Sequence, residues 1–230
     1  MSISQTRRLL LLTAGPLGAR VRELLEHCAL PMIAYDLAEW GGWSEDDFAA
    51  ALEQAEAQLA AAVLWRPFPT LMQQFNAAAY RRGIPWTIGL LDTTLIQIGP
   101  TVIPGETACY TCFLKRFLTN SGLSRIDMET FAFYDHDQQA GYRGQLAPLE
   151  QFAASLISME LQRLSGGETV ASTGAYWYMD PIRHDQGRHP IVPVPWCRIC
   201  SRVDDPQEWS YEHLAEALAE RMVLKGKIHV

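Results

Sequence analysis

The sequence lacks two features that would place it in familiar functional classes. It has no apolar run of about eighteen residues, the length at which a helix becomes a candidate membrane span, so we expect no membrane association. It also has no excess of basic residues, because it contains 19 Lys and Arg and 26 Asp and Glu, which gives a formal net charge of −7. Because nucleic-acid binding uses a basic face, this balance argues against a nucleic-acid partner.

Cysteine is scarce, and its placement is uneven. Five cysteines occur in 230 residues, and four of them form two Cys-x-x-Cys pairs, Cys109 with Cys112 and Cys197 with Cys200. The apolar run Leu9–Leu12 is too short for a signal peptide, so we expect a cytoplasmic protein. In a reducing compartment, paired cysteines are metal ligands or redox centres more often than structural disulfides.

The two pairs have the residue types and spacing of a zinc site. Tetrahedral zinc takes four thiolates, and a Cys-x-x-Cys turn directs two sulfurs to one point. Residues 113–196 separate the pairs, so the metal would fasten two distant segments of one domain. We therefore predict one structural zinc per chain, with two independent or redox-active dithiols as the alternative. The fifth cysteine, Cys28, is expected to pack in the core.

Short apolar runs alternate with helical periodicity in the first hundred residues. The pattern predicts strands over 9–14, 32–35, 61–64, 85–91 and 95–98, and helices over 17–28, 44–59 and 70–82. Such alternation indicates βαβ units. Residues 1–100 are thus predicted to form a Rossmann-like half, an α/β fold with a mostly parallel sheet and helices on both faces.

The remaining residues are expected to complete a single domain over 1–230. Residues 101–205 form a half fastened by the zinc site, with a helix from Cys109 to about Asn120 and a mobile crossing segment over 121–147. A helix over 148–164 and a strand over 171–179 follow, with Trp177 in the core. The polar residues from His184 to His189 are expected on surface loops, and 206–230 is predicted to contain a C-terminal helix.

The first strand–helix turn keeps only part of a dinucleotide-binding loop. Gly15 and Gly18 match the second and third glycines of G-x-G-x-x-G, but the first glycine is missing. Pro16 removes a backbone N–H that would face a phosphate, while Asp36 stands where a carboxylate could hold a ribose hydroxyl. Gly15, Gly18 and Asp36 therefore form a degenerate cofactor site, and ATP binding is not expected.

Several short motifs lie around the cysteines. They are Gly83-Ile-Pro-Trp86, Ile98-Gly-Pro100, Val102-Ile-Pro-Gly105, Ala108-Cys109-Tyr-Thr-Cys112 and Pro195-Trp-Cys197-Arg-Ile-Cys200. Over residues 8–205 the chain resembles the ThiF-like proteins, adenylating enzymes related to ubiquitin activation. It is most similar to their ocin-ThiF-like, SagC-like branch, which assists a YcaO-type enzyme in converting Cys, Ser and Thr of a ribosomal peptide into azolines. By this resemblance, the four paired cysteines are the family's zinc ligands.

The resemblance implies a partner subunit without catalytic residues. Active members carry an acidic residue after the third strand, where this chain has Trp65-Arg66-Pro67, and Arg66 is expected to be a surface or ion-pair residue. Thioester-forming members also need a cysteine between the two pairs, and 113–196 contains none.

The implied partners are a YcaO-type cyclodehydratase, a ribosomal precursor peptide and a second copy of the chain, with an azoline dehydrogenase as a further candidate. The pathway would be the biosynthesis of an azole-modified bacteriocin. The alternative is an active ATP-dependent adenylyltransferase that acts on a peptide C-terminus.

Overall fold

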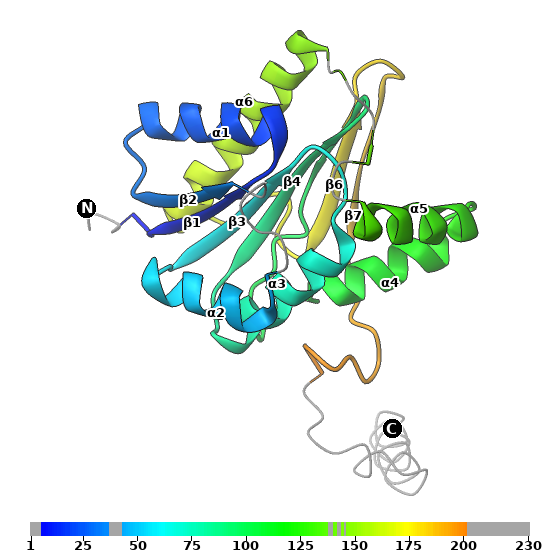
Figure 1. The fold of residues 1–230 in the computed structure, drawn as a ribbon, viewed down its shortest axis with the longest axis horizontal. Helices are drawn as coiled ribbons and strands as arrows, with labels where there is room; N and C mark the ends of the chain where they lie inside the picture. Colours follow the sequence, from blue (N-terminus) through cyan, green and yellow to red (C-terminus); the bar gives the residue numbers. More distant parts are fainter. Residues whose placement is uncertain (1–5, 37–42, 138–139, 142–143, 145, 202–230) are drawn as a thin grey trace, which may run out of the picture.

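The computed structural model describes residues 6–36, 43–137, 140–141, 144 and 146–201. Its centre is a seven-stranded sheet with the strand order β2-β1-β3-β4-β5-β6-β7 (Figure 1). The strands are β1 (Leu9–Thr13), β2 (Met32–Asp36), β3 (Leu59–Leu64), β4 (Trp86–Asp92), β5 (Leu95–Ile98), β6 (Ala175–Asp180) and β7 (Asp185–Pro190).

The sheet is mixed, which corrects the prediction of a mostly parallel sheet. The pairs β2–β1, β1–β3 and β3–β4 are parallel, whereas β4–β5, β5–β6 and β6–β7 are antiparallel. Short turns account for two of the antiparallel pairs, β4–β5 and β6–β7, whereas residues 99–174, which contain three described helices, connect β5 to β6. β4 and β5 are joined by a turn in which Thr93 adopts φ 58°, and so tight a turn can join only antiparallel strands.

Helices cover both faces of the sheet, as predicted. α1 (Gly15–His27) packs with α6 (Ala147–Ser165) on one face. The other face carries α2 (Glu45–Gln54), α3 (Pro69–Arg81), α4 (Tyr110–Asn120) and α5 (Ser124–His136) (Figure 1). β1 and β3 are buried along their whole length because helices cover them on both sides, which accounts for their uninterrupted apolar sequences.

Local sequence signals explain where several elements begin and end. α2 begins with a capping box, in which the Asp47 N–H donates to Ser44 Oγ at 3.3 Å and the Ser44 N–H donates to the Asp47 carboxylate at 2.7 Å. The helix ends at Gln54, before the predicted boundary at 59, because Glu56 adopts φ 44°.

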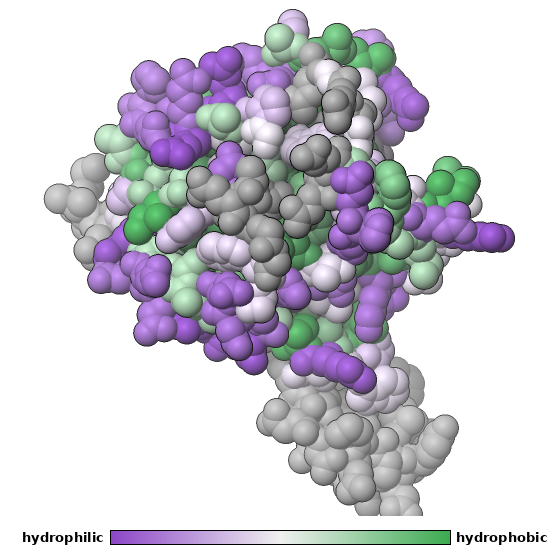
Figure 2. Space-filling model, viewed as in Figure 1, coloured by the Kyte–Doolittle hydropathy of each residue, from purple (hydrophilic) through white to green (hydrophobic). Residues whose placement is uncertain are grey.

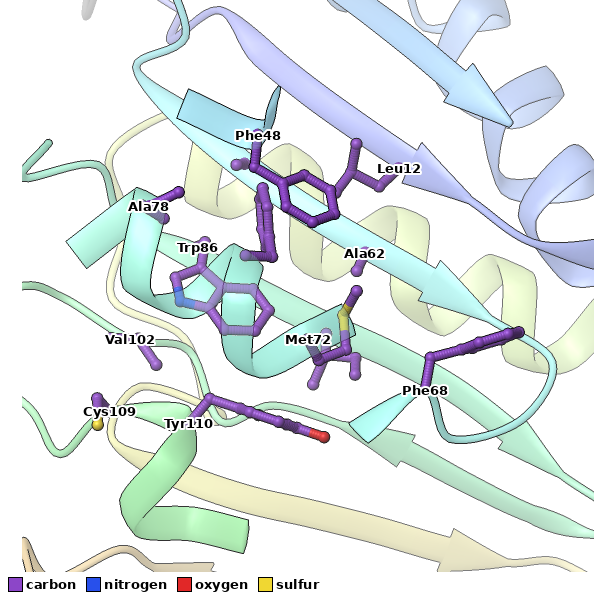
Figure 3. Packing of buried hydrophobic residues seen from close by; sticks show 14 of the residues in the cluster. Leu12, Phe48, Ala62, Phe68, Met72, Ala78, Trp86, Val102, Cys109 and Tyr110 are labelled. Atoms are coloured by element: carbon purple, nitrogen blue, oxygen red, sulfur yellow. The ribbon is translucent and has the colours of Figure 1, made fainter. Parts of the chain in front are cut away.

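The core on the α3 and α4 face is built around Trp86, which is fully buried. Its ring centroid lies 5.0 Å from that of Phe75 on α3 and 5.6 Å from that of Tyr110 on α4. Figure 3 shows Trp86 among Ala78, Val102 and Tyr110, with Cys109 at the far end of the same cluster. The aromatic core thus continues directly to the first cysteine pair.

Four sequence expectations differ from the structure, the last of them only in part. The crossing segment 121–147 contains helix α5, and the residues expected on polar loops before the second cysteine pair form β7. Cys28 is exposed at the end of α1, so the expected core packing is wrong. Trp177 packs partly buried against the core, while its neighbour Tyr176 is the more buried ring. The C-terminal helix expected in 206–230 lies outside the described residues.

The surface shows polar and apolar regions. Hydrophilic side chains cover α1, whereas hydrophilic and hydrophobic side chains are mixed over α4 and α5 (Figure 2). Leu123, before α5, and Ile126, in its first turn, are exposed. In the described part of the chain, every helix is too short or too polar to span a bilayer.

Candidate functional site

The structure brings the four paired cysteines together, although 84 residues separate the two pairs. Cys109 is the N-cap residue of α4 and Cys112 lies in the first turn of that helix. Cys197 and Cys200 belong to the turns that follow β7. The four Sγ atoms lie within 4.8 Å of one another.

The spacing of the sulfur atoms fits a tetrahedral metal. Cys109 Sγ lies 3.9 Å from Cys112 Sγ and 3.6 Å from Cys197 Sγ, and Cys112 Sγ lies 3.4 Å from Cys200 Sγ. Zn–S bonds of about 2.3 Å in tetrahedral geometry place neighbouring sulfurs about 3.8 Å apart. The four cysteines would therefore fill the coordination shell of one metal ion, which is the arrangement of a structural site.

The surroundings of Cys112 favour its thiolate form. Hydrogen bonds from the Cys109 and Cys200 thiols and from the Val194 N–H, at 3.2 Å from Sγ, hold the pKa of Cys112 well below its usual range, and the same bond between Cys109 and Cys112 raises the pKa of Cys109. The thiolate is the form of cysteine that binds metals. The Val194 contact also orients the ligand, as hydrogen bonds from outside a coordination shell commonly do.

The residues of the degenerate nucleotide loop lie at one edge of the sheet, and Trp65 packs against one of them, Gly15. Thr13, at the end of β1, pairs with Asp36 at the end of β2, and Asp36 is exposed. Gly15 has φ +71°, and a Cβ added there would lie 2.6 Å from Trp65 Cδ1. The indole thus covers the backbone that would otherwise approach a phosphate.

Gly141, which is not part of the nucleotide loop, lies against the six-membered ring of the Trp65 indole. Gly141 has φ +136°, and a Cβ added there would lie 2.7 Å from Trp65 Cη2. Gly18 of the nucleotide loop allows α1 to pack closely on the strands, because a Cβ added there would lie 2.7 Å from Thr13 Cβ and 3.0 Å from the Val63 carbonyl oxygen. Gly15 and Gly18, the two retained glycines of the nucleotide loop, therefore each have a packing role that requires no nucleotide.

Arg66 is completely buried, which corrects the expectation of a surface residue. Its guanidinium carbon lies 3.9 Å from the ring centroid of Phe68 and 4.6 Å from that of Tyr134. The guanidinium also donates to the carbonyl oxygens of Pro67, Asp137 and Tyr134 at 2.8, 3.1 and 3.3 Å. Arg66 therefore fastens the end of β3 to the C-terminal end of α5.

Replacing Gly15 by alanine tests the packing of Trp65 directly. Both the positive φ and the contact with the indole oppose a Cβ, so we expect G15A to cost about 2–5 kcal/mol of unfolding free energy in urea. Gly83 is the matched control, since it has φ +67° with nothing within 4 Å of an added Cβ. G83A should cost about 1–2 kcal/mol.

The contact with Trp65 can be isolated in a double-mutant cycle. We expect G15A to cost less in a W65A background, because the ring that opposes the new Cβ is then absent. Equal costs of G15A in both backgrounds would contradict the described packing.

Comparisons with known proteins support the fold at low sequence identity. No protein-family description matches the sequence, and no curated protein is similar to it. Among solved structures, the heterocyclase TruD superposes with a TM-score of 0.64 and 16% identity over 92% of this chain, which spans 32% of TruD. MccB of E. coli gives 0.61 and 17% over 87% of this chain and 68% of MccB.

A further structure, the microcin C7 biosynthetic enzyme MccB in complex with N-formylated MccA, gives a TM-score of 0.62 and 18% identity over 87% of this chain and 69% of that chain. The chain thus shares its fold with a heterocyclase and with a microcin biosynthetic enzyme, and it corresponds to about a third of the heterocyclase.

Proposed function

We propose that this chain is a non-catalytic, zinc-containing ThiF-like subunit that assists a YcaO-type cyclodehydratase in forming azolines on a ribosomal precursor peptide. The observation that carries the proposal is the Trp65 indole, which lies against Gly15 at the turn where a nucleotide-binding loop would open. The fold similarity to the heterocyclase TruD supports a role in peptide modification.

The groups around this turn are poorly suited to hold a nucleotide. Pro16 occupies the first turn of α1, where backbone N–H groups would otherwise face a phosphate. The position that follows β3 carries the buried cation Arg66, which binds backbone carbonyls, instead of a carboxylate that could hold magnesium. Both features favour a subunit that positions other components over one that activates a substrate.

The proposed zinc would act as a cross-link. Cys109 and Cys112 would hold it from α4, and Cys197 and Cys200 from the segment that follows β7. When bound, a four-thiolate zinc supplies structural stability, since no coordination position is left for a substrate.

Co-purification tests the proposed partnership. We expect the full chain, co-expressed with a YcaO-type enzyme from its source genome, to be retained with that enzyme on affinity resin and in size-exclusion chromatography. Absence of any complex with peptide-modifying enzymes from that genome would overturn the proposal. The same proposal includes a homodimer, a further complex with an azoline dehydrogenase, and a cytoplasmic location. Sedimentation tests the homodimer, and co-purification tests the complex with the dehydrogenase.

The alternative, an ATP-dependent adenylyltransferase acting on a peptide C-terminus, is favoured by the fold similarity to MccB. ATP–pyrophosphate exchange separates the two functions. We expect no exchange above the buffer rate with the full chain and the encoded precursor peptide, because Trp65 and Pro16 oppose phosphate binding. Exchange that depends on both ATP and peptide would establish the alternative.

A further inference from the structure

A groove of about 610 Å³ lies between α4 and the β6–β7 hairpin, away from the nucleotide loop and beside the metal site. Phe113 and Phe117 of α4 line one side, and Tyr176 and His189 line the other. Ile191 and Val192, which follow β7, complete it, and Val192 is 62% exposed. Its volume lies in the range of about 300–1,000 Å³ that is typical of ligand sites.

The rings of the groove are ordered by mutual packing. The ring centroid of Phe113 lies 5.2 Å from that of Tyr176, and the His189 ring stacks on Tyr178 at 5.7 Å with an interplanar angle of 5°. Preformed aromatic walls of this kind suit an apolar side chain, since little ordering is needed on binding.

The charge of the groove favours an acidic ligand. Arg116 is its one charged lining residue in the described part of the chain, where no Asp or Glu lines it. Arg116 Nη2 donates to the Pro193 carbonyl oxygen at 3.3 Å, whereas its buried Nε has no hydrogen-bond partner among the described residues. A carboxylate beside Arg116 would complement this charge.

The adjoining sheet edge is open. Among the described residues, β7 is the last strand of the sheet and no strand pairs with its outer side. The Ile191 N–H donates to the Gly174 carbonyl oxygen at 2.9 Å, and the alternation of an antiparallel ladder then directs the backbone groups of Gln186 and Arg188 away from β6. An extended chain can pair with such groups.

We infer that the groove and the outer edge of β7 together bind an extended acidic segment of the precursor peptide, which adds a strand to the sheet and places an apolar side chain in the groove. The inference deepens the proposed function and rests on it for the identity of the peptide. The edge supplies backbone hydrogen bonds, the rings supply apolar contact, and Arg116 selects acidic residues.

Fluorescence polarisation with the full chain tests this binding. The probe is a pool of labelled ten-residue peptides in which glutamate alternates with apolar residues, and a pool with lysine in place of glutamate is its control. We expect saturable binding of the acidic pool and at least about tenfold weaker binding of the lysine pool. No binding of the acidic pool, or equal binding of both pools, would overturn the inference.

Two pairs of variants locate the site. V192E should weaken binding of the acidic pool at least about tenfold by placing a like charge in the groove. I182E is its control, because Ile182 is 61% exposed on the same hairpin but does not line the groove.

The second pair tests the edge of β7. Q186P removes an outward backbone N–H and should weaken binding about tenfold, whereas Q186A keeps that N–H and should not weaken binding. Equal effects within either pair would count against the site.

Other occupants of the groove give different results. Displacement of the acidic pool by a synthetic peptide of residues 202–230 would assign the groove to this chain's own C-terminal segment, and a dimer that V192E dissociates would assign it to a second copy. Either result overturns the inference. A chain that co-purifies with the YcaO-type enzyme yet binds no acidic pool would leave the proposed function standing while refuting the groove assignment.

Discussion

Replacing Cys112 by serine is expected to lower the melting temperature by about 10 °C or more. Cys112 is buried and its Sγ lies 3.4 Å from that of Cys200, so the variant would lose the proposed metal and, with it, the link between α4 and the segment after β7. Structural zinc contributes several kcal/mol, and each kcal/mol shifts the midpoint of a chain of this size by about 2–4 °C. Differential scanning calorimetry measures the change.

Cys28 provides the control for this experiment. It is exposed, and the described hydrogen bond of its side chain comes from Gln162 Nε2 at 3.2 Å, so C28S should change stability by no more than about 0.5 kcal/mol. A zinc chelator should reproduce the fall in melting temperature in the unmodified chain and leave C112S unchanged. Less than about half an equivalent of zinc per purified chain, or equal melting of C112S and C28S, would contradict the four-thiolate site.

Replacing Trp86 by alanine is expected to cost about 3–5 kcal/mol of unfolding free energy. The indole is fully buried between Phe75 and Tyr110, so its removal leaves a cavity where α3 and α4 meet the sheet. Urea denaturation followed by far-UV circular dichroism measures the loss.

Trp196 is the matched control for Trp86, since it is 64% exposed. Its replacement by alanine should change the unfolding free energy by no more than about 0.5 kcal/mol. If W86A and W196A were equally stable, the core could not be centred on Trp86.

The first half of the fold could be predicted because the sequences of its buried strands are themselves diagnostic of strands. β1 and β3 are apolar from end to end, and Gly83 ends α3 where the sequence indicates. β7 has no such signal: its sequence, DQGRHP, is polar because this edge strand is largely exposed on both sides. α5 was equally hard to predict, since it contains no fully buried residue.

The candidate site likewise contains some residues whose placement the sequence predicts and others whose placement it does not. The four cysteines could be predicted to lie together from the sequence alone, since two Cys-x-x-Cys pairs are typical of a zinc site. The burial of Arg66 depends instead on carbonyl groups of Tyr134 and Asp137, which lie 68 and 71 residues away along the chain. The approach of Gly141 to Trp65 is likewise a tertiary contact that no local pattern encodes.

The short segment Ile191–Val194 touches both the groove and the sulfur cluster. Ile191 and Val192 line the groove, Pro193 accepts a hydrogen bond from Arg116, and the Val194 N–H donates to Cys112 Sγ. Under the proposed function, an occupant of the groove that favours the metal-bound arrangement of this segment would raise the affinity of the cysteines for a metal. Since coupling between two binding sites is reciprocal, the proposed metal would raise the affinity for that occupant by the same factor, and removal of zinc would then weaken peptide binding.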